Sequence, residues 1–244
     1  LRDYTKWDDE PRSAGAIVET MLRANQMARS EPPGPVYVCL DAGLQEAALE
    51  EEIKIPDVSR FQPSEPPRGS VDAVKETVDM LLGASNPVIM IGRSGRSQEA
   101  WNNRVKLAEL VGAGVFTNLR NAAVFPSDHL LHVGRPAGRI TDTMRSTVTE
   151  ADAILSLNWL DFGGTQRLLT RDGELKGKIV HCSMEEYVHN GFGGELFELP
   201  MADIKITADH DAFVVQLIDE IEGRDSTKGW DGKRVGPQPE PYEK

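Results

Sequence analysis

The sequence lacks several features by which common classes of protein are identified. It has only two cysteines, aromatic residues make up 6% of it, and its 27 Lys and Arg are outnumbered by 39 Asp and Glu in 244 residues. The resulting net charge of -12 would repel phosphate backbones and anionic membranes, so neither nucleic acid nor a membrane is an expected partner. No run approaches the ~18 apolar residues of a membrane span, and the charged first residues do not resemble a signal peptide. We therefore expect a globular, cytoplasmic protein with one good-sized core or with one domain plus part of another.

The two cysteines are expected to pack as buried apolar side chains. Cys39 and Cys182 each lie in an apolar run typical of a buried strand, where a thiol behaves as a small hydrophobe. We therefore expect neither a disulfide nor a metal centre at these positions.

Changes in composition divide the chain into segments. Residues 1–46 predict one helix, capped by Ser13, and one strand near residues 36–40, which together cannot enclose a core. Residues 47–69 are acidic and rich in proline, as in a semi-extended linker. Residues 224–244 are polar, contain three prolines and predict a second linker. Because the chain opens at Leu1 in a charged segment, we also expect its start to be cut and a further domain to follow the second linker.

Residues 70–223 predict one doubly wound α/β domain. Apolar runs predict strands, separated by helical patterns, over residues 88–91, 115–117, 153–157, 179–182 and 204–206. Asp209 is the expected cap of the last helix, and Gly223 follows it where left-handed backbone is favoured. The fold class is therefore α/β, with a mostly parallel sheet in a Rossmann-like domain, preceded by the helix and strand of residues 1–46.

A candidate site lies outside the carboxyl ends of the strands, where doubly wound sheets bind ligands. Gly92, Arg93 and Ser94 follow the first strand of the domain. Asn118 and Asn158 lie in the loops expected after two later strands, the second of which covers residues 158–164. These residues are a candidate nucleotide site, in which phosphates would lie against the Gly-rich turn. The full G-x-G-x-x-G pattern is missing, so a tight turn without a ligand stays open as the alternative.

Asp128, His129 and His132 are close enough along the chain to suggest metal ligands, because residues three apart share a helical face. The ligand set is incomplete, and Pro126 favours a packed irregular turn, so we predict no metal site here. The sequence has no H-E-x-x-H and no G-x-S-x-G motif, and we assign no catalytic residue.

The order of these segments resembles the acetolactate synthase and benzoylformate decarboxylase group of thiamine diphosphate (ThDP)-dependent enzymes. Residues 33–41 look like the last strand of that family's pyrimidine-binding domain, and residues 86–93 look like the opening of its central domain. Residues 108–113, 125–130 and 150–155 continue the central domain in the family's order.

The resemblance implies an intact enzyme that acts on 2-keto acids with ThDP and Mg²⁺ and forms a homodimer or homotetramer. It assigns residues 1–46 to the end of the pyrimidine-binding domain and residues 70–223 to the central domain, with the diphosphate-binding domain expected beyond residues 224–244. In this family the central domain binds FAD, ADP or nothing. The early glutamate that activates ThDP and the G-D-G motif that holds Mg²⁺ do not occur in this sequence. We therefore expect that this chain alone neither binds ThDP nor decarboxylates.

Two other functions stay open. The first is a free-standing Rossmann-like nucleotide-binding module of an NAD- or FAD-linked oxidoreductase, against which stands the missing glycine fingerprint. The second is a non-catalytic scaffold or regulatory protein that kept the fold and lost the chemistry.

Overall fold

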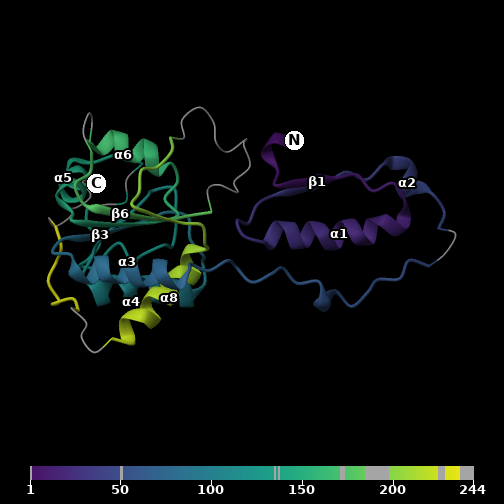
Figure 1. Ribbon diagram of the computed structural model, residues 1–244. Helices are drawn as coiled ribbons and strands as arrows, with labels where there is room; N and C mark the ends of the chain where they lie inside the picture. Colours follow the sequence, from purple (N-terminus) through teal and green to yellow (C-terminus); the bar gives the residue numbers. More distant parts are fainter. Residues whose placement is uncertain are drawn as a thin grey trace. The chain divides into compact units, whose positions relative to one another are not determined.

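The computed structural model describes residues 2–49, 52–134, 136, 138–170, 174–184, 198–224 and 229–236. The chain divides into two compact units, each of which is described by itself (Figure 1). Among the described residues, those from 2 to 66 form unit 1, and those from 67 to 236 form unit 2. No helix in the described part of the chain is long and apolar enough to cross a membrane.

Unit 1 is a strand-helix-strand motif flanked by short helical turns. In chain order its elements are η1 (Arg2–Tyr4), β1 (Trp7–Asp9), α1 (Ala14–Arg29), β2 (Val36–Val38), α2 (Ala42–Glu46) and η2 (Val58–Arg60). The two strands pair in parallel, with Trp7 opposite Val36. The helix α1 begins as the sequence predicts, because the Ser13 side chain accepts a hydrogen bond from the Ala16 N–H.

The strand β1 corrects the prediction of one helix and one strand in this unit. It contains one tryptophan and two aspartates, so it has none of the apolar pattern by which strands are identified. Asp9 is accommodated because its carboxylate accepts a hydrogen bond from the Thr20 hydroxyl of α1 at 2.8 Å. Strand β2 ends at Val38, so Cys39 lies after the strand and is half-buried; both Cys39 and Cys182 are free thiols.

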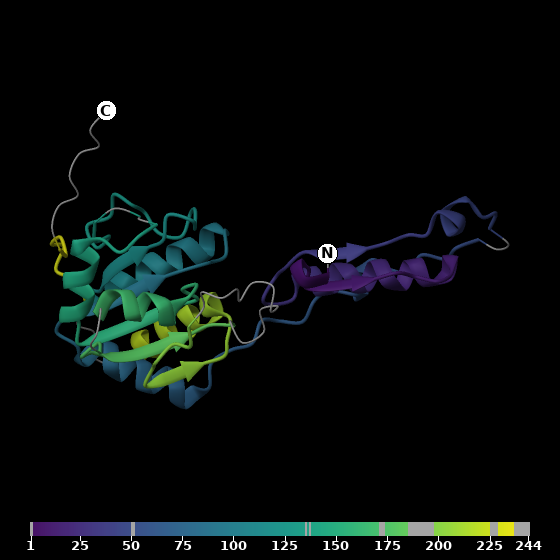
Figure 2. The ribbon, with the colours of Figure 1, turned by 90° about the horizontal axis from the view of Figure 1, so that it is seen from above.

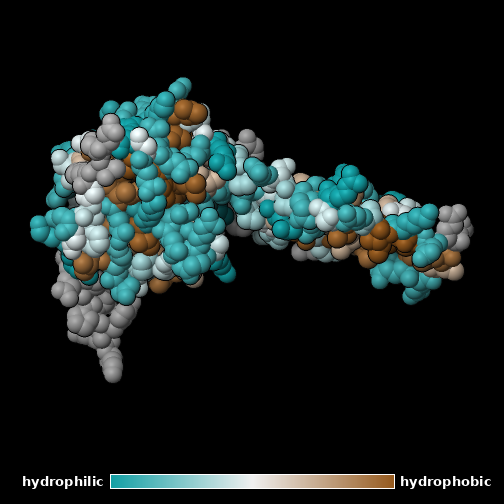
Figure 3. Space-filling view, turned by 90° about the horizontal axis from the view of Figure 1, so that it is seen from below, coloured by the Kyte–Doolittle hydropathy of each residue, from teal (hydrophilic) through white to brown (hydrophobic). Residues whose placement is uncertain are grey.

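Unit 1 has almost no hydrophobic core of its own. Among its described residues, 2–49 and 52–66, only Pro11, Thr20 and Ala24 are buried. Large apolar side chains such as Ile55 are exposed, and Figure 3 shows apolar residues on the surface of this unit. Because two strands alone are marginally stable in water, the described contacts give unit 1 little stability.

Unit 2 contains a five-stranded, fully parallel sheet. Its strands are β3 (Pro87–Ile91), β4 (Gly114–Thr117), β5 (Ala153–Leu157), β6 (Lys178–Cys182) and β7 (Ile204–Ile206). They lie in the order β4-β3-β5-β6-β7, and all neighbouring pairs are parallel. This arrangement confirms the predicted α/β fold class, and each strand lies within a few residues of its predicted range.

Helices cover both faces of this sheet (Figures 1 and 2). The helices α3 (Val71–Gly83), α4 (Gln98–Val111) and α8 (His210–Glu222) pack on one face, and α5 (Asp142–Glu150) and α6 (Phe162–Thr170) pack on the other. Alternate residues of one strand enter opposite cores: Ile89 and Ile91 face the three-helix side, whereas Val88 and Met90 face the two-helix side. Burial on both faces explains why the strands read as continuous apolar runs.

Two local predictions in unit 2 are wrong. The sequence predicts an irregular loop through Gly163 and Gly164, but both belong to α6. A Cβ at Gly163 would overlap the Glu198 carbonyl oxygen, so this glycine allows a close approach and does not break the helix. Gly223 follows α8 as predicted, yet its φ of -72° is right-handed and not left-handed.

The predicted second linker is docked over part of its length. In residues 229–236, the N–H groups of Gly229 and Trp230 donate to carbonyl groups near the end of α4, and the Val235 N–H donates to the Leu130 carbonyl. The rest of the predicted linker, residues 225–228 and 237–244, lies outside the described residues.

Candidate functional site

The carboxyl edge of the unit 2 sheet carries the predicted site. From β3 the chain moves to β4 on one side and then returns to β5 on the other. The strand order therefore reverses between β3 and β5, which is where doubly wound sheets bind ligands. Gly92 directly follows β3, and Asn158 directly follows β5.

The loops after β3 and β5 are hydrogen-bonded to each other. The Gly92 N–H donates to the Leu157 carbonyl at 2.8 Å, and the Arg93 N–H donates to the Asn158 carbonyl at 3.2 Å. A Cβ at position 92 would overlap the Asn158 carbonyl oxygen, so only glycine permits this approach. These two N–H groups are used within the protein, which leaves neither of them to hold a phosphate.

Asn158 holds three strand ends together. It has a φ of 47°, in the left-handed region that asparagine tolerates better than most residues. Its Nδ2 donates to the Arg93 carbonyl at 2.9 Å, and its Oδ1 accepts from the Ser183 hydroxyl at 3.2 Å. The side chain thus links the residues that follow β3, β5 and β6.

Ser94 and Asn118 are half-buried at the same edge and make local hydrogen bonds. The Ser94 hydroxyl donates to the Gly92 carbonyl at 3.2 Å, and the Asn118 side chain accepts from the Arg120 N–H at 2.9 Å. The structure therefore brings Gly92, Arg93, Ser94 and Asn158 together, whereas no hydrogen bond among the described residues joins Asn118 to them.

A buried arginine that the sequence analysis did not identify fixes this edge. The side chain of Arg104 in α4 has no exposed surface and forms an ion pair with Asp211 in α8, with 2.5 Å between Nη1 and Oδ1. Its Nη2 donates to the Gly95 carbonyl at 3.0 Å, and its Nε donates to the Val124 carbonyl at 2.8 Å. Asp211 accepts in turn from the Gly95 N–H at 2.7 Å. Both backbone groups of Gly95 are therefore clamped by one charged pair.

His210 lies beside this pair with only 6% of its side chain exposed. Its Nε2 is 3.5 Å from the Asp211 carboxylate, and its Nδ1 is 3.9 Å from the carboxylate of Asp209. Burial lowers the pKa of His210, an effect that the two aspartates oppose and that Arg104 and Arg93 reinforce. The imidazole is therefore neutral at pH 7.

The histidines considered as metal ligands are engaged elsewhere. The His132 Nδ1 donates to the Gly134 carbonyl, so its Nε2 accepts from the Thr117 hydroxyl at 2.9 Å. The His129 Nδ1 accepts from the Leu131 N–H, and its Nε2 donates to the Glu109 carboxylate at 3.2 Å. Both ring nitrogens of each histidine have protein partners. Within the described ranges, no three His, Cys, Asp or Glu side chains form a group that could hold a metal.

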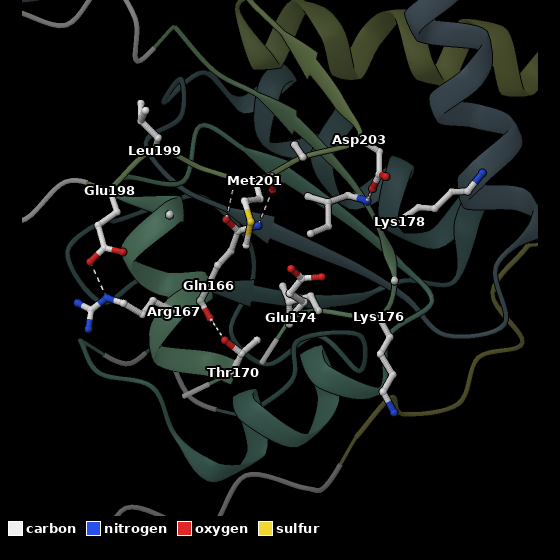
Figure 4. Close-up of a pocket in the computed structure, with 15 residues that line it drawn as sticks. Gln166, Arg167, Thr170, Glu174, Lys176, Lys178, Glu198, Leu199, Met201 and Asp203 are labelled. Carbon is white, nitrogen blue, oxygen red and sulfur yellow. Dashed lines mark hydrogen bonds and ion pairs between the residues drawn. The ribbon is translucent and has the colours of Figure 1, made fainter. Parts of the chain in front are cut away.

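A cavity of about 650 Å³ lies against α6, between the residues that precede β6 and those that precede β7 (Figure 4). Its buried wall is Gln166, which donates to the Met201 carbonyl at 2.6 Å and accepts from the Met201 N–H at 2.9 Å. At its rim Arg167 forms an ion pair with Glu198 at 2.5 Å. These polar groups hold residues 198–201 against α6, and they are not directed at a ligand.

Comparison with known proteins agrees with this architecture. The family model described as "Thiamine pyrophosphate enzyme, central domain" matches residues 74–190; thiamine pyrophosphate is another name for ThDP. The chain is 29% identical over 161 residues to "Probable acetolactate synthase large subunit" of Methanocaldococcus jannaschii, covering 63% of this chain and 26% of that protein. It is 31% identical over 123 residues to "Glyoxylate carboligase" of Escherichia coli O157:H7, covering 50% of this chain and 20% of that protein.

A solved structure extends the likeness to both units. Benzoylformate decarboxylase from Polynucleobacter necessarius matches 98% of this chain with a TM-score of 0.70 and 19% sequence identity, over 41% of its own chain. These matches show that the chain resembles ThDP-dependent enzymes. The match to their central domain lies mainly in unit 2, and the chain spans about a quarter of the length of the curated relatives named above.

The described residues do not fit the Mg²⁺ that accompanies ThDP. Asp231-Gly232 is the described sequence nearest to a G-D-G motif, but the Asp231 carboxylate forms an ion pair with Lys233 at 2.8 Å. Its hydrogen bonds with Lys233 lower the pKa of Asp231 and occupy its oxygens. Asp172-Gly173, the other such sequence, lies outside the described residues.

The low pKa of His210 predicts a specific loss of stability in mild acid. In the unfolded chain a histidine titrates near pH ~6.5. Because the folded pKa is lower, the unfolded state binds more protons below that pH, and the free energy of unfolding falls as the pH is lowered through ~6.5. Urea unfolding at pH 7.5 and 5.5 should show a smaller loss in His210→Gln than in the natural chain, since other titrating groups are common to both. Equal losses in the two chains would contradict this assignment.

Proposed function

We propose that this chain is part of a ThDP- and Mg²⁺-dependent enzyme that decarboxylates or joins 2-keto acids in the cytoplasm. The observation that carries the proposal is the match of residues 74–190 to the central-domain model. The sheet of unit 2 also has a doubly wound strand order. The names of the relatives support the chemistry, because they include an acetolactate synthase, a carboligase and a decarboxylase.

In this proposal the units correspond to parts of two family domains. Residues 1–46 are the end of the pyrimidine-binding domain, residues 47–69 connect it to the central domain at residues 70–223, and residues 224–244 lead towards the diphosphate-binding domain. The scarcity of buried residues in unit 1 supports this assignment, because such a unit needs further partners to bury its apolar surface. Unit 2 has two well-buried hydrophobic clusters and needs no further partner to bury its apolar surface.

ThDP, Mg²⁺ and the 2-keto acid are then bound by parts of the enzyme other than the described residues, in a homodimer or homotetramer. When bound, ThDP supplies the nucleophilic carbon of the reaction. The contribution of the described chain is to hold its neighbouring domains, since it offers no Mg²⁺ ligand set.

Calorimetric titration tests whether ThDP and Mg²⁺ are bound by other parts of the enzyme. The 244-residue chain should give no saturable heat with ThDP and Mg²⁺, because the groups that hold them lie elsewhere. A longer protein that includes the flanking coding sequence should bind both. Micromolar binding of ThDP by the 244-residue chain would overturn the proposal.

A second candidate role is the binding of ADP or FAD at the carboxyl edge of unit 2. Its support is the position of Arg93 and Ser94 at the reversal of strand order, next to the Gly-rich turn. Since the N–H groups of Gly92 and Arg93 are used, a nucleotide here would be held by side chains, chiefly the Arg93 guanidinium with Ser94 and Asn118.

Thermal unfolding tests this role. At about 100 times its dissociation constant, ADP should stabilise the chain by about 2.7 kcal/mol, a rise in Tm of a few degrees. The rise should be lost in Arg93→Gln and kept in Arg96→Gln, which removes an exposed arginine of the same turn. No rise with ADP and no flavin absorbance in the purified protein would exclude the role. Saturable binding of NAD instead would favour the oxidoreductase module.

A further inference from the structure

Residues 229–236, here called the strap, are a docked segment for which the family assignment gives no role. The strap lies against the end of α4 and the edge of the sheet, within unit 2. Three of its residues, Gly229, Gly232 and Gly236, have positive φ angles of 62°, 80° and 73°. This backbone favours glycine and gives the strap a defined turning path.

The first half of the strap closes the carboxyl end of α4. The last carbonyl groups of a helix have no partner inside the helix. Here the Gly229 N–H donates to the Leu110 carbonyl at 3.1 Å, and the Trp230 N–H donates to the Glu109 carbonyl at 2.8 Å. The strap therefore satisfies backbone groups that would otherwise need water.

Trp230 anchors this half through its ring. Its centroid is 5.2 Å from that of His129, which in turn contacts Phe125 edge-on at 5.3 Å and donates to Glu109. The indole Nε1 donates to the Lys233 carbonyl at 2.6 Å and closes the turn of the strap. Trp230 is thus held on both sides, by the protein beneath it and by the strap itself.

The second half of the strap lies against residues 130–133, the segment that pairs with the edge strand β4. The Val235 N–H donates to the Leu130 carbonyl at 3.1 Å, and its side chain packs against both hydrophobic clusters. A Cβ on Gly114 in β4 would lie 3.1 Å from Val235. The strap thereby adds cover outside residues 131–133, whose Leu131 carbonyl and Val133 N–H already hydrogen-bond to Val115 of β4.

The other end of unit 2 has an anchor of a different kind. The Gln216 side chain in α8 donates to the Gly69 carbonyl at 3.0 Å and accepts from the Gly69 N–H at 2.9 Å. This amide clamp holds the chain where it enters the unit, 147 residues away in sequence. The ion pair between Arg104 and Asp211 joins α4 to α8, so both anchors are attached to one pair of helices.

We propose that the Trp230 strap and the Gln216 clamp are two independent anchors, one holding residues 229–236 and the other holding the chain where it enters unit 2. Unit 2 then acts as a rigid body between these two fixed chain positions. Release of Trp230 frees the strap and leaves the fold and the entry unchanged. This inference goes beyond the proposed function, and it does not depend on the cofactor or the substrate.

Hydrogen exchange of the whole 244-residue chain tests the two anchors at single amides. The Val235 N–H reports on the strap, the Gly69 N–H on the clamp, and the Ile89 N–H in β3 on the core. In Trp230→Ala the Val235 amide should exchange at least about tenfold faster, while the Gly69 and Ile89 amides keep their natural rates. In the matched variant Gln216→Ala the Gly69 amide should accelerate and the Val235 amide should not.

Three results would overturn the proposal. The Val235 amide could keep its natural rate in Trp230→Ala, which would show that Trp230 does not hold the strap. Each variant could accelerate both reporter amides, which would show that the anchors are not independent. Loss of protection at Ile89 in Trp230→Ala, or a failure of that variant to fold, would show that the strap belongs to the core.

Discussion

The buried guanidinium of Arg104 is the interaction on which the order of the carboxyl edge depends. A charge without exposed surface is costly unless its donors are satisfied, and here they reach Asp211, Gly95 and Val124. These partners lie on α8, on the turn after β3 and in the residues beyond β4. One side chain from α4 therefore sets the relative positions of three parts of the chain that are remote in sequence.

The Arg104 ion pair also explains why the backbone N–H groups at this edge are already hydrogen-bonded. With Gly95 clamped on both its backbone groups, the turn that starts at Gly92 lies against Asn158, and the N–H groups that could hold a phosphate bond to neighbouring carbonyl groups instead. Unit 2 thus has the topology of a nucleotide-binding domain, but the backbone N–H groups after β3 are hydrogen-bonded to carbonyl groups of the protein itself. The architectural role proposed above agrees with this arrangement.

The sequence alone predicted the structure correctly wherever residues close together in the chain determine it. Both-sided burial made the strands of unit 2 readable as apolar runs, and the caps at Ser13 and Asp209 are local hydrogen bonds at fixed spacing. Predictions were wrong where contact with a segment distant in sequence determines the structure. Asp9 of β1 is satisfied by Thr20 of α1, and Gly163 is required by the approach of Glu198, so neither pattern signals its structure by itself.

The candidate site was only partly predictable for the same reason. Topology placed Gly92, Arg93, Ser94 and Asn158 together, because carboxyl ends of adjacent parallel strands share one edge. Arg104 lies on the buried stripe of α4 with Leu107, Ala108 and Val111, and a charge on such a stripe was the available signal. Its partner Asp211 is 107 residues away, and no periodicity could identify it.

The most direct test of this account is urea unfolding of Arg104→Met, with Arg96→Met as the control for loss of an exposed arginine nearby. Removing one partner of a buried ion pair leaves the other charge and the Gly95 and Val124 groups unsatisfied, so the free energy of unfolding should fall by about 3 kcal/mol. The control should change it by less than about 0.5 kcal/mol. A loss in Arg104→Met no greater than that of the control would contradict the claim that this side chain holds the carboxyl edge together.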